Sequence, residues 1–437
     1  LLWEAPHIGE KAPEQIPEAQ DFCEGYKTFL NEGKTERECV KKAVTLLENA
    51  GYQKFDPKAS YKAGDKIYWN NRKKAIIAST IGTKDLNEGL RMNGAHIDSP
   101  RLDLKPNPLF EKDEIAYLKP HYYGGIRKYQ WGTVPLSMHG VVVKADGEVV
   151  EISIGENEGD PQFCVTDLLP HLASEQNGRK LAEGLKGEEL NIIIGSIPYH
   201  DEENEKIKNP AKLLAMKLLN ERYGITEKDF TRAEIEMVPA YKAVDIGLDR
   251  GLVGAYGQDD RVCAYTALMA EIGTKNPEHT TFTILTDKEE IGSVGNTGLH
   301  SDYVHHAVED LAESFGADTK TVLRHSICLS SDVNAAYDPT FASVYESRNS
   351  SYVNKGCVLT KYTGARGKSG SSDASAETMA KVIGIMEENG VYWQTGELGA
   401  VDAGGGGTIA YILANYGMRV IDSGVAVLNM HAPWEII

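Results

Sequence analysis

The sequence predicts an α/β protein whose catalytic part is interrupted by an inserted β-rich domain. Helix patterns alternate with short, buried-strand patterns in residues 1–103 and again in 246–437, whereas signals for antiparallel hairpins fill residues 104–245. A chain of 437 residues is long enough to form both parts. We therefore predict a first catalytic segment (1–103), an inserted domain (104–245) and a second catalytic segment (246–437).

The first catalytic segment contains a helix pattern followed by strand patterns. Thr35 and Glu38 have the spacing of a capping box, and apolar residues at helical spacing follow as far as Gly51, which predicts a helix over 35–51. The runs at 75–82 and 92–97 are short, apolar and bounded by Gly or Asn, which is typical of buried strands.

The inserted segment shows antiparallel patterns. Asp146 and Gly147 stand between two valine-rich arms, the strongest short signal for a hairpin. Residues 233–238 alternate strictly between apolar and polar, which predicts another strand. One helix is predicted from Pro210 to Tyr223, with Asn209 as its cap.

The α/β rhythm returns after residue 246. Helices are predicted at 260–272, 303–315 and 374–389 and after the glycine run 404–407, and strands at 280–286, 326–330, 391–395 and 425–431. Ligands of such open sheets bind at the carboxyl ends of the strands.

Composition excludes several classes of protein. Lys plus Arg number 46 against 64 Asp plus Glu, so the net charge of −18 repels phosphate backbones and argues against nucleic acid as a partner. The longest apolar runs are far too short to span a membrane. Six cysteines without a C-x-x-C pair suit a reducing compartment, and we expect a cytoplasmic protein.

Five segments place metal-ligating residue types at the predicted strand ends. They contain His96 with Asp98, Asp259 with Asp260, Glu289 with Glu290, Asp332, and His431. Imidazole and carboxylate groups are ligands that zinc prefers. Each segment is a weak signal by itself, but strand ends converge in an α/β sheet, so the set indicates one metal site.

The charges of this set fit a two-metal site. Three carboxylates, from Asp259, Glu290 and Asp332, together with a shared hydroxide balance two divalent cations, and two imidazoles complete the ligand shell. Asp98 stands two residues after His96, where it is suited to accept the second imidazole N–H.

Glu289 and Glu290 are adjacent just after a predicted strand. In an extended segment, neighbouring side chains point to opposite sides, so one can bind metal while the other contacts the water molecule. Adjacency leaves open which glutamate has which role.

The chain resembles the aspartyl aminopeptidase family, which includes vacuolar aminopeptidase I. The resemblance runs nearly end to end and lies in the motifs NGAHIDSPRLDLK, YGGIRKYQWG, YGQDDRVCAYTAL, DKEEIGS, SSDVNAAYDP, GGGGTIAYILA and LNMHAPWE. It implies a zinc-peptidase-like (phosphorylase/hydrolase-like) mixed-sheet catalytic domain with an inserted β-rich dimerisation domain. It also implies assembly into hollow tetrahedral dodecamers.

The same resemblance assigns roles to the site residues. It implies that His96, Asp259, Glu290, Asp332 and His431 are the metal ligands, that Asp259 bridges, that Glu289 is the general base and that Asp98 supports His96. It leaves the preferred N-terminal residue open, because Ala335 and Asp338 stand where acid-preferring members carry histidines.

We therefore predict a metal-dependent aminopeptidase with a dinuclear site that releases N-terminal amino acids from peptides. Zinc is the expected metal, and manganese or cobalt also suit these ligands. Its expected partners are peptide substrates and further copies of itself. Two alternatives remain at this point, an amidohydrolase acting on acylated amino acids and a non-catalytic shell or cargo protein of the same fold.

Overall fold

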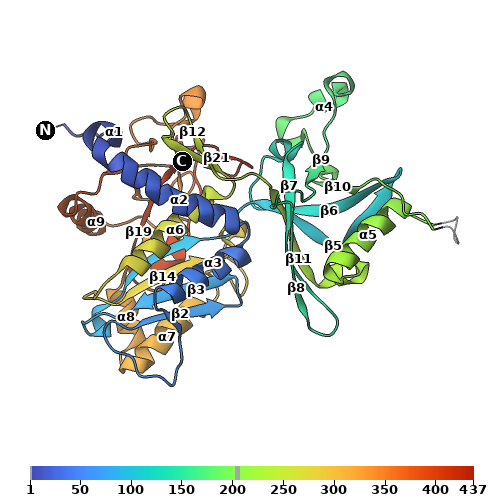
Figure 1. Ribbon diagram of the computed structural model, residues 1–437. Coiled ribbons are helices and arrows are strands. Elements are labelled where there is room, and N and C mark those ends of the chain that lie inside the picture. The colour runs from blue at the N-terminus through green and yellow to red at the C-terminus, as the bar shows by residue number, and fades with distance from the viewer. Residues whose placement is uncertain (1, 202–206) are drawn as a thin grey trace. The chain divides into compact units, whose positions relative to one another are not determined.

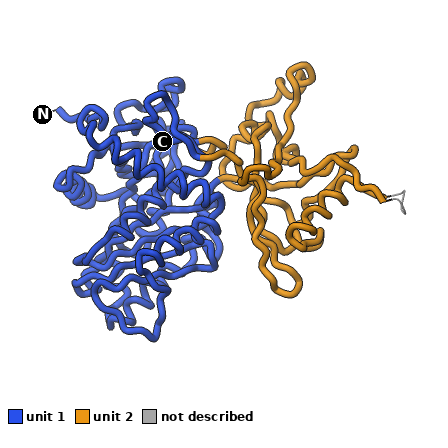
Figure 2. The backbone as a smooth tube through the Cα atoms, viewed as in Figure 1, with its two compact units in different colours: residues 1–99, 243–430, 435–437 blue, residues 100–242, 431–434 orange. Residues whose placement is uncertain are grey.

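The computed structural model describes residues 2–201 and 207–437, which form two compact units (Figure 2). The first unit takes the chain up to Ser99, then Ala243–Met430 and Glu435–Ile437. The second takes Pro100–Lys242 and the short segment His431–Trp434.

These unit boundaries differ from the ranges that we predicted. The second unit begins at residue 100 rather than 104 and ends at 242 rather than 245. Strand pairing explains both differences, because β5 (Arg101–Lys112) belongs to the sheet of the second unit and β12 (Val244–Ile246) pairs within the first.

The first unit is built on a mixed sheet of nine strands in the order β1-β2-β3-β14-β4-β15-β19-β17-β18 (Figure 1). Its four central strands β14, β4, β15 and β19 run parallel, whereas β3 and β17 pair antiparallel to their inner neighbours. The strands are β1 (Gln53–Lys54), β2 (Lys66–Asn71), β3 (Ala75–Thr80), β4 (Arg91–His96), β14 (Thr281–Thr286), β15 (Ile327–Ser330), β17 (Cys357–Thr360), β18 (Trp393–Thr395) and β19 (Arg419–Gly424).

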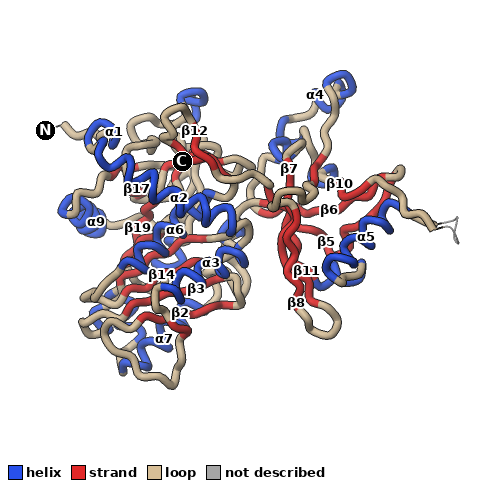
Figure 3. Tube along the Cα trace, viewed as in Figure 1, coloured by secondary structure: helices blue, strands red, loops and turns tan. Residues whose placement is uncertain are grey.

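Helices pack on both faces of this sheet (Figures 1 and 3). Alternate residues of one strand enter different cores: Ile76 of β3 packs with α2, α3 and α6, whereas Ile77 packs with α7, α8 and α10. The helices are α1 (Ile8–Lys11), α2 (Ile16–Glu32), α3 (Glu36–Asn49), α6 (Gln258–Gly273), α7 (Tyr303–Phe315), α8 (Thr319–His325), α9 (Ala376–Glu388) and α10 (Ala410–Ala414).

Two small sheets complete the first unit. In one of them β13 (Leu252–Ala255) lies between β12 and β21 (Glu435–Ile436). The other pairs β16 (Asn334–Ala335) with β20 (Ala426–Val427).

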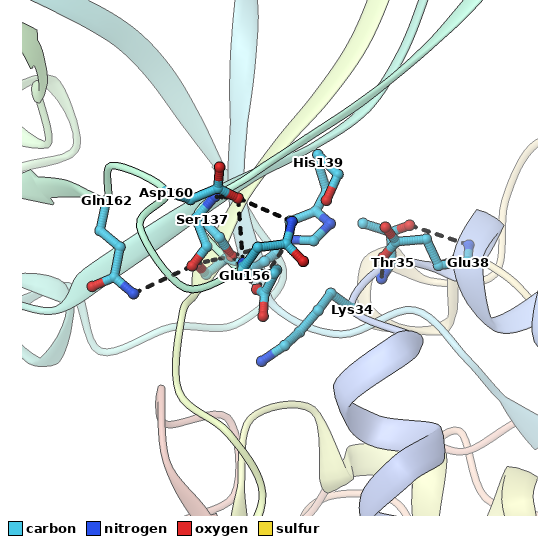
Figure 4. Close-up of polar contacts among 12 residues, drawn as sticks. Lys34, Thr35, Glu38, Ser137, His139, Glu156, Asp160 and Gln162 are labelled. Atoms are coloured by element: carbon cyan, nitrogen blue, oxygen red, sulfur yellow. Dashed lines mark hydrogen bonds and ion pairs between the residues drawn. The ribbon is translucent and has the colours of Figure 1, made fainter.

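The capping box that we predicted begins α3. The Thr35 hydroxyl accepts the Glu38 N–H at 3.3 Å, and the Glu38 carboxylate accepts the Thr35 N–H at 3.1 Å (Figure 4). Val40, Ala43 and Leu47 then lie on the buried face of the helix. The reciprocal bonds satisfy two N–H groups that would otherwise lack partners at the start of the helix.

Two sequence predictions were wrong in detail, and one strand was missed. Asn209 precedes α5 but makes no side-chain cap bond to it. The strand predicted at 425–431 is confined to β20, because the chain turns through positive φ at Asn429 and His431. The preceding segment, which we did not predict, forms the central strand β19.

The second unit is an antiparallel sheet of seven strands that closes on itself, because β11 pairs with both β5 and β7. Its strands are β5, β6 (Ile115–Tyr123), β7 (Pro135–Val143), β8 (Val149–Ile154), β9 (Phe163–Val165), β10 (Ile192–Gly195) and β11 (Ala233–Pro239). The predicted hairpin at Asp146 and Gly147 is present as β7 and β8. Two helices, α4 (Ser174–Asn177) and α5 (Pro210–Tyr223), belong to this unit.

A buried polar cluster links β7 of the second unit to the turn after β8 (Figure 4). Ser137 donates to Glu156 at 2.7 Å, and the His139 ring nitrogen Nε2 lies 3.0 Å from the Ser137 hydroxyl and 3.2 Å from Glu156. Lys242 pairs with the other oxygen of Glu156 at 2.6 Å. The buried polar groups thus have partners, which makes the cluster compatible with the interior of the sheet.

All six cysteines are described and are free thiols. No helix within residues 2–201 and 207–437 has the length and apolar character to cross a membrane.

We expect Thr35→Ala to lower the free energy of unfolding by about 1 kcal/mol, because it removes the acceptor of the Glu38 N–H. Thr45→Ala is the matched control, since Thr45 is exposed in the middle of the same helix. Urea denaturation followed by circular dichroism measures both. Equal losses for the two variants would contradict a specific role of the cap.

Candidate metal centre

Three neighbouring strands bring the candidate residues to one edge of the sheet. His96 ends β4 and pairs with Thr286, the last residue of β14, so the glutamates at 289 and 290 follow beside it. On the other side of β4, β15 ends at Ser330, two residues before Asp332. The predicted convergence of carboxyl strand ends is therefore present.

The imidazole of His96 lies at the centre of a carboxylate cluster. Its Nε2 atom is 3.1 Å from Asp259 Oδ1, 3.8 Å from Asp332 Oδ1 and 4.0 Å from Glu289 Oε2. His96 and Asp259 are almost fully buried, whereas Glu289 and Asp332 keep part of their side-chain surface exposed. The cluster therefore has a buried floor and a side that solvent reaches.

Asp98 contacts both His96 and the turn that carries Glu289 and Glu290. Its carbonyl oxygen lies 3.0 Å and its Oδ1 3.3 Å from His96 Nδ1, so the other ring nitrogen faces the cluster. Its two carboxylate oxygens also accept the backbone N–H groups of Glu289 and Glu290 at 3.1 and 3.2 Å. One fully buried carboxylate thus orients the imidazole and fixes the turn that carries both glutamates.

Glu289 and Glu290 do not lie in an extended segment, which corrects our prediction. They begin the 3₁₀ turn Glu289–Ile291, and Lys288 before them has a left-handed backbone conformation. The alternation of a strand therefore does not separate their side chains. The turn places a carboxylate oxygen of Glu290 within 4.8 Å of one of Asp259.

The backbone of Asp259 is held from both sides. Its N–H donates to Glu435 Oε2 at 3.0 Å, and its carbonyl accepts from the Ser99 hydroxyl at 2.7 Å. Glu435 is buried in β21, which pairs with β13 just before Asp259 in the chain. These contacts restrict the orientation of the Asp259 carboxylate.

Asp332 depends on a close backbone contact with β19. A Cβ atom at Gly424 would lie 1.7 Å from the Asp332 carbonyl oxygen, so only glycine allows the two segments to pass at this distance.

Burial and charge crowding raise the affinity of this cluster for positive charge. Burial, followed by the negative charges of Asp260, Asp259 and Glu289, raises the pKa of Asp332 well above its usual value, against the opposing effect of His96. Burial alone would lower the pKa of His96, but its contacts with Asp259 and Asp98 and the charge of Asp332 raise it well above the usual value. Divalent cations that accept both imidazole and carboxylate fit this donor set, because they would supply the missing positive charge.

His431 lies in the segment His431–Trp434 of the second unit. Within that unit its Nδ1 lies 2.8 Å from the Gly125 carbonyl oxygen, so the ring orientation is fixed there. Its role as a ligand stays a prediction.

Our sequence reasoning missed three positioning residues. Ser99 and Glu435 stand inside motifs that we had singled out, so their proximity to ligand positions was a usable signal. Gly424 lies in a strand that we did not predict, and nothing in the sequence marks it.

An imidazole surrounded by carboxylates at the carboxyl edge of an α/β sheet defines a candidate metallohydrolase. Comparison with known proteins identifies the family within this class. The family described as aminopeptidase I zinc metalloprotease (M18) matches residues 29–437.

Individual relatives agree with this match. A probable M18 family aminopeptidase 1 of Clostridium acetobutylicum is 52% identical over 97% of this chain and 92% of its own length. The crystal structure of an M18 aminopeptidase from Thermotoga maritima has a TM-score of 0.95 and 44% identity, covering 100% of this chain and 96% of that one. The structure of a yeast mApe1 dodecamer has a TM-score of 0.77 at 22% identity, with 96% and 93% covered.

The chain therefore belongs to the M18 family of zinc metallo-aminopeptidases. This assignment confirms the predicted family, the zinc-peptidase-like mixed α/β fold and the metal-dependent aminopeptidase function. It favours the aminopeptidase over both alternatives.

We expect Gly424→Ala to lower the free energy of unfolding by about 1–3 kcal/mol and to reduce peptidase activity, because the new methyl group forces Asp332 to move. Gly384→Ala in α9 is the control: its Cβ would meet no atom within 4 Å, and alanine favours a helix. Thermal unfolding and hydrolysis of an aminoacyl p-nitroanilide measure the two effects. Wild-type behaviour of Gly424→Ala would contradict the close contact.

Proposed function

We propose that the chain is a dinuclear aminopeptidase in which His96, Asp259, Glu290 and Asp332, with His431 as fifth ligand, hold two divalent cations. The observation that carries this proposal is the position of His96 Nε2, which lies within 4.0 Å of oxygens from Asp259, Asp332 and Glu289. Asp259 also lies within ligand-sharing distance of Glu290, which supports its predicted role as the bridging carboxylate.

Zinc is the proposed metal, since imidazole and carboxylate are ligands that it accepts in open catalytic sites. Manganese or cobalt could occupy the same donors. When bound, the two cations supply Lewis acidity, which lowers the pKa of a water molecule and polarises a scissile carbonyl.

Glu289 is the proposed general base. Its side chain is partly exposed, with 18% of its surface accessible, and its Oε2 atom lies 4.0 Å from His96 Nε2. The Asp98 carboxylate fixes the Glu289 backbone at 3.1 Å, so the base is held beside the ligands. From this position Glu289 can accept a proton from water and return it to the leaving amine.

The proposed substrates are peptides with a free α-amine. The M18 relatives are named aminopeptidases, enzymes that act on a free N-terminal amine, which supports this substrate class over acylated amino acids. Parallel assays on free-amine peptides and their N-acetyl forms distinguish an aminopeptidase from an amidohydrolase.

Removal of divalent metal should abolish peptidase activity, because the carboxylates and His96 then lack their compensating charge. The measurement is hydrolysis of an aminoacyl panel before and after exhaustive chelation, with elemental analysis of the bound metal. Two metal equivalents per chain are expected at full activity. Undiminished turnover by metal-free protein would refute the proposal.

We expect Glu289→Gln to keep both metals and to lose several orders of magnitude in kcat, because an amide preserves the shape but cannot accept a proton. Asp98→Asn is the comparison variant. It should lose only about 10- to 100-fold, since it disturbs the orientation of His96 and the glutamate turn rather than the proton transfer. Near wild-type kcat for Glu289→Gln would mean that another group is the base.

Self-association through the second unit is the remaining part of the proposal. It is supported by exposed apolar side chains in residues 168–197 of this unit, namely Leu168, Leu169, Leu172, Leu181 and Ile197, which are 49–68% exposed. The dodecameric state of the yeast relative is consistent with a dodecamer here.

Light scattering after size exclusion should give a mass many times the 47.9 kDa of one chain. Leu172→Asp should reduce this mass, because it places a charge on an apolar contact surface. Leu248→Asp is the matched control, since Leu248 is fully exposed in the first unit. A wild-type protein at monomer mass would contradict self-association and leave the metal chemistry untouched.

A further inference from the structure

A cavity lies on the central sheet of the first unit, over the amino-terminal halves of the parallel strands. It has a volume of about 270 Å³ and is lined by residues of β4, β14 and β15 together with α6 and α9. The metal-ligating side chains follow the opposite, carboxyl ends of these strands.

The cavity exists because the helices leave part of one sheet face uncovered. Ala95 and Ile97 continue the face of β4 that packs against α2, α3 and α6, and Leu285 does so for β14. Farther toward the strand starts, the same faces carry Arg91 and Asn93, which are only half-buried. Residues in the middle of a parallel sheet are normally covered on both faces, so this opening is unusual.

Most of the cavity wall is apolar. Ile327 and Leu329 of the central strand β15 are half-buried, and Val382, Ile385 and Met386 of α9 face them across the cavity. Ile385 keeps 51% of its surface exposed. Such a wall would gain free energy by covering these side chains with an apolar ligand.

Three cations that form no close ion pair with a described residue lie at the strand-start side of the cavity, and Glu88 and Glu377 attract two of them only from a longer distance. Arg91 lines it and contacts the Leu90 carbonyl at 3.2 Å and His279 Nε2 at 2.7 Å, but has no acid within 4 Å in the described part of the chain. Lys381 of α9 and Arg419 at the start of β19 likewise make no ion pair with any described residue. Burial together with the charges of Arg91 and Arg419 lowers the pKa of Lys381, so the three cations are close enough to repel one another.

Asn93 adds hydrogen-bond donors on the same strand face as Arg91. Its Oδ1 accepts from the Ser331 hydroxyl at 2.7 Å, which identifies the carbonyl side of the amide. The amide hydrogens make no hydrogen bond to any residue that the structure describes. Asn93 and Arg91 thus offer unused N–H groups two residues apart on one strand.

The one acid that lines the cavity is already satisfied. Glu271 accepts hydrogen bonds from the hydroxyls of Tyr52, Thr80, Thr281 and Thr283 at 2.8–3.0 Å. Three of these hydroxyls share Oε1 and the Thr283 hydroxyl contacts Oε2, and burial raises the pKa of Glu271. The carboxylate is thus held by hydroxyl groups and forms no ion pair with Arg91.

We propose that this cavity binds a small apolar monocarboxylate, whose chain lies against β15 and α9 and whose carboxylate is held by Arg91 and Asn93. Charge complementarity selects the head group, because Arg91, which forms no ion pair in the described part of the chain, and the free amide N–H groups of Asn93 stand beside an apolar wall. The volume is at the small end of ligand sites and suits a ligand of about ten non-hydrogen atoms, such as octanoate.

The first experiment measures binding to the intact, metal-loaded oligomer by isothermal titration calorimetry, with octanoate as the probe and 1-octanol as its neutral counterpart. Octanoate should bind with a Kd of about 1 mM or below and at least about tenfold more tightly than 1-octanol. Absence of binding, or equal affinity for the two compounds, overturns the proposal.

Arg91→Gln tests the head-group contact. It should weaken octanoate about tenfold or more and leave 1-octanol within about twofold, because only the carboxylate uses the guanidinium. Arg324→Gln is the control, since Arg324 is an exposed arginine of α8 on the other face of the sheet. Equal octanoate affinity for the wild type and Arg91→Gln refutes the assigned position.

A cysteine at the cavity rim locates the ligand independently of Arg91. Octanoate should slow alkylation of Ile385→Cys, measured on the peptide by mass spectrometry, and leave Val391→Cys unchanged, since Val391 is similarly exposed but does not line the cavity. Protection of Ile385→Cys without ligand that disappears when the oligomer is dissociated would show that a second copy covers the cavity, and would overturn the proposal. Lack of protection by octanoate does so as well.

Discussion

The site depends on one electrostatic constraint, the crowding of carboxylates around the buried imidazole of His96. Asp259, Asp332 and Glu289 all approach the same ring nitrogen, and the burial of His96 and Asp259 reduces the screening of their repulsion by water. Positive charge stabilises such a cluster, which is why its carboxylates raise the pKa of His96 and why divalent cations suit the site. The chemistry of an M18 aminopeptidase follows from this demand for cations.

Groups that repel one another need rigid support to stay together. Here the support consists mainly of contacts that fix the backbone of the segments carrying these groups. Asp98 accepts the N–H groups of the glutamate turn and also contacts His96, so one carboxylate connects β4 to the segment after β14. Glu435 and Ser99 hold the peptide groups of Asp259, and the close passage of Gly424 fixes Asp332. The candidate ligands are therefore held in place by the fold itself, which would lower the entropic cost of binding a metal.

The two ends of the central sheet have opposite electrostatic characters. Carboxylates collect where the parallel strands end, whereas Arg91, Arg419 and Lys381 gather near their starts. The helices cover the middle of the sheet, but α6 and α9 leave a cavity at the cationic end. The same strands thus carry a candidate metal centre at one end and a proposed carboxylate site at the other, and Asn93 contacts Ser331, the neighbour of Asp332, between them.

Local chemistry in the sequence determined the elements and the ligand types. The capping box before α3 and the Asp146-Gly147 hairpin act through neighbours in the chain, so they could be recognised without a structure. The set of His and acidic residues could be recognised because each member stands near the end of a predicted strand. Only the tertiary structure decided the 3₁₀ turn at Glu289, the contact of Gly424 with Asp332 and the cavity beside Arg91. These features arise where distant segments meet, and their distances depend on strand order and helix packing, which local patterns do not encode.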